Sequence, residues 1–158
     1  MKKGIIAILG TITGTIVGAA STNYLQSKEI KLQFEKVEKF KNYYNLLNQW
    51  LLLKNENKGL SDYFIKNNYK KIAIYGMGEL GSRLVEELKD SDIVIKYAID
   101  KNAGGAYSEI EVRSMDDVLD NVDAVIVTAV FAFDEIEIEL SKIVDCPIIS
   151  LEDVIYVL

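Results

Sequence analysis

The chain contains no histidine, a single cysteine and a single proline among its 158 residues. Without histidine it lacks the commonest general base and metal ligand, and it cannot form Ser-His or Cys-His nucleophile pairs. One cysteine, Cys146, excludes an internal disulfide and a zinc site built from cysteines. The net charge of −6 and the lack of a long basic stretch argue against nucleic-acid binding. Any chemistry must therefore come from Asp, Glu, Lys, Tyr, Ser or a bound cofactor.

Charge is also missing from the N-terminal segment GIIAILGTITGTIVGAASTNYL, residues 4–25. As a helix, this segment reaches roughly 33 Å, enough to cross a hydrocarbon core of about 30 Å. We therefore predict a transmembrane anchor in residues 1–26. Lysines are more numerous after the span than before it, which favours a cytoplasmic globular part. Two alternatives remain open: a signal peptide cleaved near Ala20, giving a secreted protein, and a buried soluble helix.

The N-terminal half offers two faces for self-association. Gly10, Gly14 and Gly18 repeat every fourth residue and form a small-residue groove on one helix face. Residues 27–69 form the predicted helical linker region, with an amphipathic helix up to about residue 54. Its apolar stripe, at residues 30–51, is typical of a helix that packs on the neighbouring domain or on a second copy. The stripe consists of Ile30, Phe34, Val37, Phe40, Tyr44, Leu47 and Leu51.

Two shorter features complete this linker region. Trp50 and the three leucines after it, residues 51–53, are expected to dock on the globular part. NENKG at 55–59 marks a helix end, and a short second helix is expected to begin with Ser61 or Asp62 as its cap.

Residues 70–158 alternate apolar runs with helical patterns. This alternation predicts an α/β domain with a doubly wound, mostly parallel five-stranded sheet of order 3-2-1-4-5. The expected strands are 71–75, 93–99, 109–114, 123–130 and 147–151. The expected helices are 79–89, 134–144 and a terminal turn from 152, with one further helical turn from Met115. Asp134 and Glu135 are expected to cap the second of these helices.

A glycine-rich loop comes after the first of these strands, in the sequence KIAIYGMGELG. Gly76 permits a tight exit from the strand, Gly78 lets a phosphate approach the backbone, and Gly81 lets the helix press on the sheet. The start of the helix adds unpaired N–H groups that attract an anion. The loop thus predicts a dinucleotide site formed by Gly76, Met77, Gly78, Glu79, Leu80 and Gly81. The alternative is that the glycines serve strand–helix packing alone.

Other predicted site residues lie at strand ends. Asp100, 24 residues after Gly76, is placed to accept a hydrogen bond from a ribose hydroxyl, and Lys101 beside it leaves NAD and NADP both open. Thr128 and Ala129 end the fourth strand at the edge where ligands of such sheets bind. Glu79 opposes anion binding unless its carboxylate points away from the loop.

These motifs resemble the Rossmann-like module of bacterial polysaccharide-biosynthesis proteins, including membrane-linked nucleotide-sugar dehydratases. The resemblance covers about 88 residues and lies in the Gly-x-Gly-Glu-x-Gly loop, in Ile99-Asp100 and in the SMDDVL turn. It implies NAD or NADP binding, and it implies that a glutamate at position 79 is a normal part of such a loop. Catalytic members continue into a second domain with a Tyr-x-x-x-Lys pair. The stretch YLQSK at 24–28 has that spacing but lies at the edge of the predicted anchor, and we interpret it as coincidence.

The sequence therefore predicts a membrane-tethered nucleotide-binding module, with domains at 1–26, 27–69 and 70–158. A regulatory or scaffolding role in envelope polysaccharide synthesis rests on the resemblance alone. No catalytic residues and no metal ligands are predicted, so an enzyme acting alone is disfavoured. Two alternatives stay open: a small NAD(P)-dependent oxidoreductase or epimerase-like subunit, and a ligand-free structural module.

Overall fold

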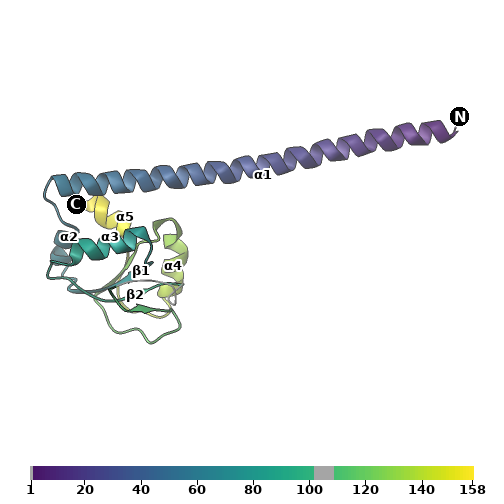
Figure 1. The fold of residues 1–158 in the computed structure, drawn as a ribbon. Helices are drawn as coiled ribbons and strands as arrows, with labels where there is room; N and C mark the ends of the chain where they lie inside the picture. Colours follow the sequence, from purple (N-terminus) through teal and green to yellow (C-terminus); the bar gives the residue numbers. More distant parts are fainter. Residues whose placement is uncertain (1, 102–108) are drawn as a thin grey trace. The chain divides into compact units, whose positions relative to one another are not determined.

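The computed structural model describes the backbone of residues 2–101 and 109–158, and the side chains of residues 28–101 and 109–158. The chain divides into two compact units, residues 1–44 and 45–158. In the first unit, the described residues belong to a single helix, α1, which runs from Lys2 to Asn55 and ends inside the second unit (Figure 1). The predicted anchor and the predicted amphipathic helix therefore form one continuous helix, because no proline and no turn sequence lies between them.

Within the described part of the chain, no helix is both long and apolar enough to span a bilayer. The side chains of the predicted anchor at 4–25, with the glycines at 10, 14 and 18, lie outside the described residues. The anchor and its glycine face accordingly stay predictions.

The second unit is an α/β domain around a five-stranded parallel sheet of order β3-β2-β1-β4-β5. The order confirms the prediction from sequence, although most strands are shorter than expected. The predicted third strand, for example, shrinks from six residues to two. The strands are β1 (Lys71–Tyr75), β2 (Val94–Ile99), β3 (Val112–Arg113), β4 (Ala124–Val127) and β5 (Ile148–Ser150).

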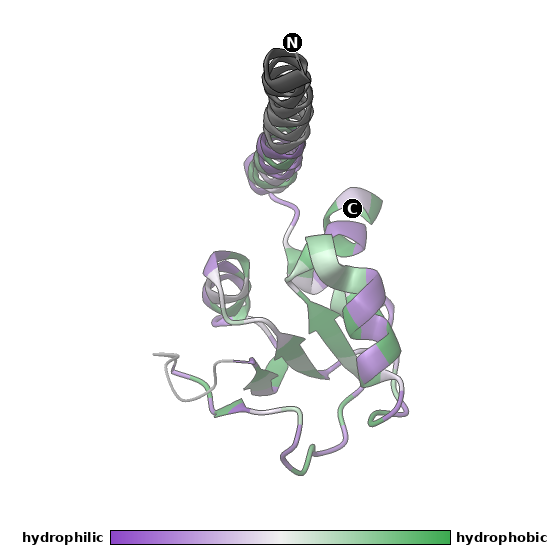
Figure 2. Cartoon of the chain, turned by 90° about the vertical axis from the view of Figure 1, so that its right-hand side faces the viewer, coloured by the Kyte–Doolittle hydropathy of each residue, from purple (hydrophilic) through white to green (hydrophobic). Residues whose placement is uncertain are grey.

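Helices cover both faces of this sheet, because successive residues of a buried strand point to opposite sides. Ala73 and Tyr75 of β1 pack with Ile136 and Leu140 of α4 (Phe133–Leu140), whereas Ile72 and Ile74 alternate with them and are equally buried. Helix α2 (Leu60–Lys66) contacts both α3 (Glu79–Leu88) and α5 (Leu151–Val157). Figure 2 shows the hydrophobic strands with helices on either side.

The C-terminal part of α1 docks on the domain through one face only. Leu46, Trp50 and Leu53 are buried, in keeping with their spacing of four and three. Leu51 and Leu52 are 57% and 47% exposed, so the expectation that they dock beside Trp50 was wrong. They point away because a helix turns by about 100° per residue.

Glu87 of α3 ties this end of α1 to the domain. Its carboxylate accepts hydrogen bonds from the Trp50 indole N–H at 2.7 Å and from the Leu60 backbone N–H at 3.0 Å. Lys54 pairs with it at 3.1 Å, and the Glu87 side chain is only 8% exposed. A buried carboxylate with three donors holds α1, α2 and α3 together.

Three local predictions need correction. The residue that caps α2 is Gly59, and Asp62 instead accepts a hydrogen bond from the Gly59 N–H. The segment after β3 forms a turn without a helix, in which the Asp117 carboxylate accepts from the Ser114 N–H. Asp134 and Glu135 lie in the first turn of α4 but make no capping hydrogen bond, since the helix begins at Phe133.

Candidate functional site

The loop after β1 makes the tight turn that its first glycine predicts. Gly76 has φ +95°, a backbone conformation that favours glycine, and its N–H donates to the Ile99 carbonyl at 2.8 Å. A Cβ at this position would lie 2.9 Å from the hydroxyl oxygen of Thr128. Gly76 is thus required by the fold itself.

Gly81 is also required by packing. A Cβ here would overlap the carbonyl oxygen of Gly76, because α3 lies directly against the loop. The third glycine of the motif therefore lets the helix approach the loop, as predicted. Together, Gly76 and Gly81 are explained without any ligand.

Gly78 differs from both. It is the N-cap of α3, with φ −73° and ψ −161°, an extended conformation that any residue adopts. Among the described residues, no atom lies within 4 Å of the position that its Cβ would take, and no side chain caps the helix. The first N–H groups of a helix have no partner within the helix, so this exposed helix start can accept an anion.

Two of the predicted ligand-binding residues, Asp100 and Thr128, form hydrogen bonds that stabilise the loop. One carboxylate oxygen of Asp100 accepts a hydrogen bond from the Met77 N–H at 2.8 Å. The Thr128 hydroxyl lies 2.6 Å from the Gly76 carbonyl oxygen, to which it donates, and the side chain is 5% exposed. Asp100 and Thr128 therefore lie at the predicted edge and fix the shape of the loop.

The charged residues of the loop are paired along α3. Glu79 lies 3.7 Å from Arg83, which also pairs with Glu86 at 3.1 Å. This pairing holds the Glu79 carboxylate along the helix surface and reduces its electrostatic repulsion of an anion at the start of α3. Lys101, beside Asp100, lies 4.0 Å from Glu139 of α4.

The two remaining predicted residues are apolar and have different roles. Leu80 is 4% exposed and belongs to the hydrophobic core. Ala129 is partly buried against the α4 side of the core and is the N-cap of a short 3₁₀ turn, Val130–Ala132.

Sequence reasoning missed Tyr75, the last residue of β1. Its side chain is 3% exposed, and its hydroxyl has no hydrogen-bond partner among the described residues. Burial raises its pKa, and the carboxylates of Glu139 and Asp100 raise it further. Nothing in the alternating pattern of β1 distinguishes Tyr75 from an ordinary core residue.

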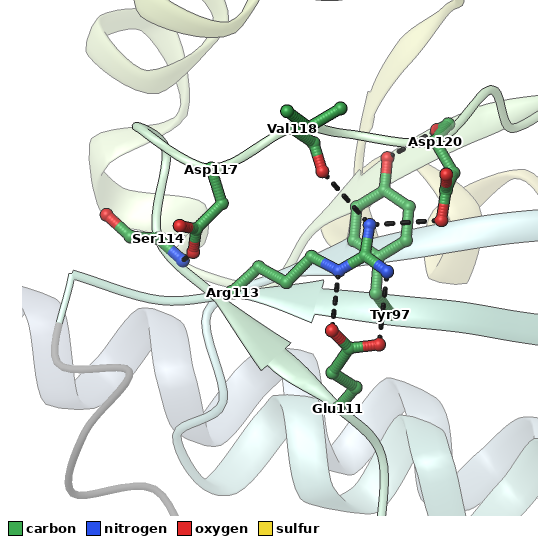
Figure 3. A network of polar contacts seen from close by, with 7 residues as sticks. All are labelled: Tyr97, Glu111, Arg113, Ser114, Asp117, Val118 and Asp120. Carbon is green, nitrogen blue, oxygen red and sulfur yellow. Dashed lines mark hydrogen bonds and ion pairs between the residues drawn. The ribbon is translucent and has the colours of Figure 1, made fainter.

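A second polar network, also missed, lies around Arg113 (Figure 3). The guanidinium forms a bidentate pair with Glu111 at 2.9 and 3.0 Å and reaches Asp120 at 3.0 Å. It also lies 4.7 Å from the centroid of the Tyr97 ring, whose hydroxyl donates to the Asp120 carbonyl. Hydrogen bonding to Glu111, above all, raises the pKa of Arg113. With these partners, the guanidinium stabilises the sheet edge.

Cys146 precedes β5 and is partly buried. Burial raises the pKa of its thiol, with the carboxylates of Asp123 and Asp145 adding to the effect. A raised pKa leaves the sulfur as a poorly reactive thiol at neutral pH. Among the described residues, there is also no group of three or more side chains that could hold a metal ion.

Comparison of the chain with protein-family models, with curated proteins and with solved structures finds no match. The resemblance to modules of polysaccharide biosynthesis stays a prediction.

Proposed function

We propose that the α/β domain is a Rossmann-like module that binds a dinucleotide or a nucleotide sugar at the carboxyl end of β1. The topology supports this location, because the chain winds outward from β1 to β2 on one side and β4 on the other. In open α/β sheets, ligands bind where the strand order reverses in this way. The glycine loop and the start of α3 lie at that point.

The observation that carries the proposal is Gly78. The backbone conformation does not require glycine there, and no atom of the described residues excludes a side chain. An uncapped helix start with open space above it is suited to a pyrophosphate, whose oxygens accept from backbone N–H groups. The bracing of the loop by Asp100 and Thr128 keeps this arrangement in place before a ligand arrives.

The proposed role is regulatory or scaffolding, with NAD or NADP as candidate cofactors. Participation in envelope polysaccharide synthesis and attachment to a membrane through residues 4–25 are parts of the same proposal and derive from the sequence. The competing possibility is a ligand-free structural module. It gains support from Gly76 and Gly81, which packing alone explains, and from Asp100, whose carboxylate already accepts from Met77.

The test is calorimetric titration of the full chain with NAD, NADP and a panel of nucleotide sugars. The full chain is used because Leu46, Trp50 and Leu53 belong to the core. Gly78→Asp places a carboxylate at the helix start, where it caps the helix and repels an anion. We expect binding at least about tenfold weaker, with the fold retained.

Gly59→Asp is the matched control, since Gly59 is the N-cap of α2 and also has an extended conformation. Binding that survives this change and is lost in Gly78→Asp supports the proposal. A folded protein that binds none of these ligands at millimolar concentration excludes it and favours the ligand-free module. Turnover of a bound cofactor identifies an oxidoreductase instead.

A further inference from the structure

One face of α1 is apolar and exposed over about six turns. Seven large side chains on this face, spaced by three and four residues, are between 36% and 77% exposed. They are Ile30, Phe34, Val37, Phe40, Tyr44, Leu47 and Leu51, and we refer to them as the stripe. Scattered apolar residues on a surface are ordinary, but a continuous row of seven is not.

The stripe is distinct from the face by which α1 docks on its own domain. Within residues 45–55, the buried residues are Leu46, Trp50 and Leu53, whereas Leu47 and Leu51 are exposed. A turn of about 100° per residue separates these two sets. Charged residues, among them Lys31, Glu35 and Lys39, fall outside the stripe on the remaining surface of the helix.

We propose that the stripe pairs with the stripe of a second copy of this chain, as a parallel two-stranded coiled coil. Positions 30, 34, 37, 41, 44, 48 and 51 alternate steps of four and three, which is the spacing of a coiled-coil seam. Five of the seven seam positions carry stripe residues. The other two are Lys41 and Asn48, and Phe40 and Leu47 flank the seam.

The polar seam residues determine the orientation. In a parallel pair in register, Asn48 faces Asn48, and the two amides hydrogen-bond to each other. In an antiparallel pair, Asn48 instead faces one of the apolar seam residues at 30, 37, 44 and 51, and its amide loses a partner. Lys41 extends its methylene groups along the seam while its ammonium group reaches water.

The area of the stripe matches the requirement of a stable dimer. Burial of roughly 100 Å² from each of the seven side chains in both copies removes on the order of 1,400 Å² from water, against about 1,600 Å² for a standard interface. An isolated helix without packing on its apolar face is also marginally stable in water. This inference goes beyond nucleotide binding and is independent of it.

The first experiment is sedimentation of the full chain in mild detergent micelles at micromolar concentration. We expect a dimer that the double variant Val37→Glu, Tyr44→Glu weakens at least about a hundredfold, because each copy places two carboxylates in the seam. Leu32→Glu is the matched control, since Leu32 lies on the same helix, is 49% exposed and falls outside the stripe. Circular dichroism checks that α1 remains helical in each variant.

The second experiment reads orientation by disulfide formation in a Cys146→Ser background. Parallel pairing in register predicts rapid cross-linking of Val37→Cys to itself and slow cross-linking of Leu32→Cys. A monomeric wild type, or a dimer that the double variant leaves intact, overturns the proposal. Equal cross-linking at both positions, or none at Val37→Cys in an intact dimer, overturns the parallel arrangement.

Discussion

At both ends of β1 an aspartate carboxylate accepts hydrogen bonds from backbone N–H groups, but the two ends differ in what the chain does next. At the amino end, the Asp123 carboxylate, just before β4, accepts hydrogen bonds from the N–H groups of Lys70 and Lys71 at 2.8 and 2.7 Å. At the carboxyl end, the Asp100 carboxylate, just after β2, accepts from the Met77 N–H at 2.8 Å. In both places, an aspartate of a neighbouring strand holds backbone N–H groups that the sheet leaves unpaired.

The ends differ in the path of the chain beyond the clamped residue. After Lys71 the chain enters the parallel sheet, so its next N–H groups are paired with neighbouring strands. After Met77 it passes through Gly78 into α3, whose first N–H groups have no side-chain cap. At the amino end, Asp123 pairs the N–H groups that precede the sheet. At the carboxyl end, the first N–H groups of α3 lack a side-chain cap, so an anion could accept from them. The same residue type at two similar positions thus says little about binding until the next residues are considered.

The largest effect is expected from Gly81→Ala, which disrupts the contact between α3 and the glycine loop at the carboxyl end of β1. The new methyl group would overlap the Gly76 carbonyl oxygen, so either the loop or α3 must move. We expect a loss of about 3 kcal/mol in the free energy of unfolding, at the upper end for overpacking a buried site. Urea unfolding followed by circular dichroism measures this loss.

Gly78→Ala is the control for that variant, because it adds the same methyl group to open space at the N-cap of the same helix. We expect a loss of at most about 1 kcal/mol in its free energy of unfolding, because alanine is a poorer N-cap than glycine but meets no steric overlap here. If both glycines tolerate alanine equally well, then Gly81 is not held against the loop by close packing.

The architecture was largely predictable from sequence, because each buried strand is a short apolar run bounded by glycine, proline or polar residues. The five strands and their order follow from β-α alternation, and the glycine positions mark the β1 turn. The docking face of α1 was harder to predict. Residues 50–53 are all apolar, and only the direction of each side chain shows that Trp50 and Leu53 are buried while Leu51 and Leu52 are exposed.

The partners within the site were not predictable in the same way. Asp100 lies 23 residues from Met77, and whether its carboxylate reaches a ribose or a backbone N–H depends on the loop path. The Arg113 network joins β3 to residues 118–120 and to a tyrosine of β2. Such contacts follow from tertiary geometry, which neither periodicity nor spacing describes.

A smaller effect is expected at the amino end from Asp123→Ala. Hydrogen bonds from the Lys71 N–H first, and also from the Lys70 N–H, hold the pKa of Asp123 below its usual range. Since the folded pKa is lowered, the stabilisation is present above the ordinary aspartate pKa of about 4 and is lost as pH falls through the folded pKa. We expect a loss of about 1 kcal/mol at pH 7, modest because the carboxylate is exposed.

The measurement is urea unfolding between pH 7 and pH 2, in which the difference between wild type and Asp123→Ala should shrink as the solution becomes acidic. Asp92→Ala is the control, since Asp92 is an exposed aspartate just before β2. A difference that stays constant down to the lowest pH rules out the charged clamp and indicates a loss of packing instead.

The smallest effect, and one of opposite sign, is expected from Tyr75→Phe at the carboxyl end. The buried hydroxyl has no partner in the part of the chain that the structure describes, so its removal relieves a desolvation cost and should raise the free energy of unfolding by up to about 1 kcal/mol. Urea unfolding measures this gain, and a loss of stability contradicts the absence of a partner. The same variant also sharpens the comparison between the two ends of β1. If it stabilises the free protein and leaves nucleotide binding unchanged, the carboxyl end binds through backbone groups alone, whereas weaker binding means that the buried hydroxyl becomes accessible when the ligand binds.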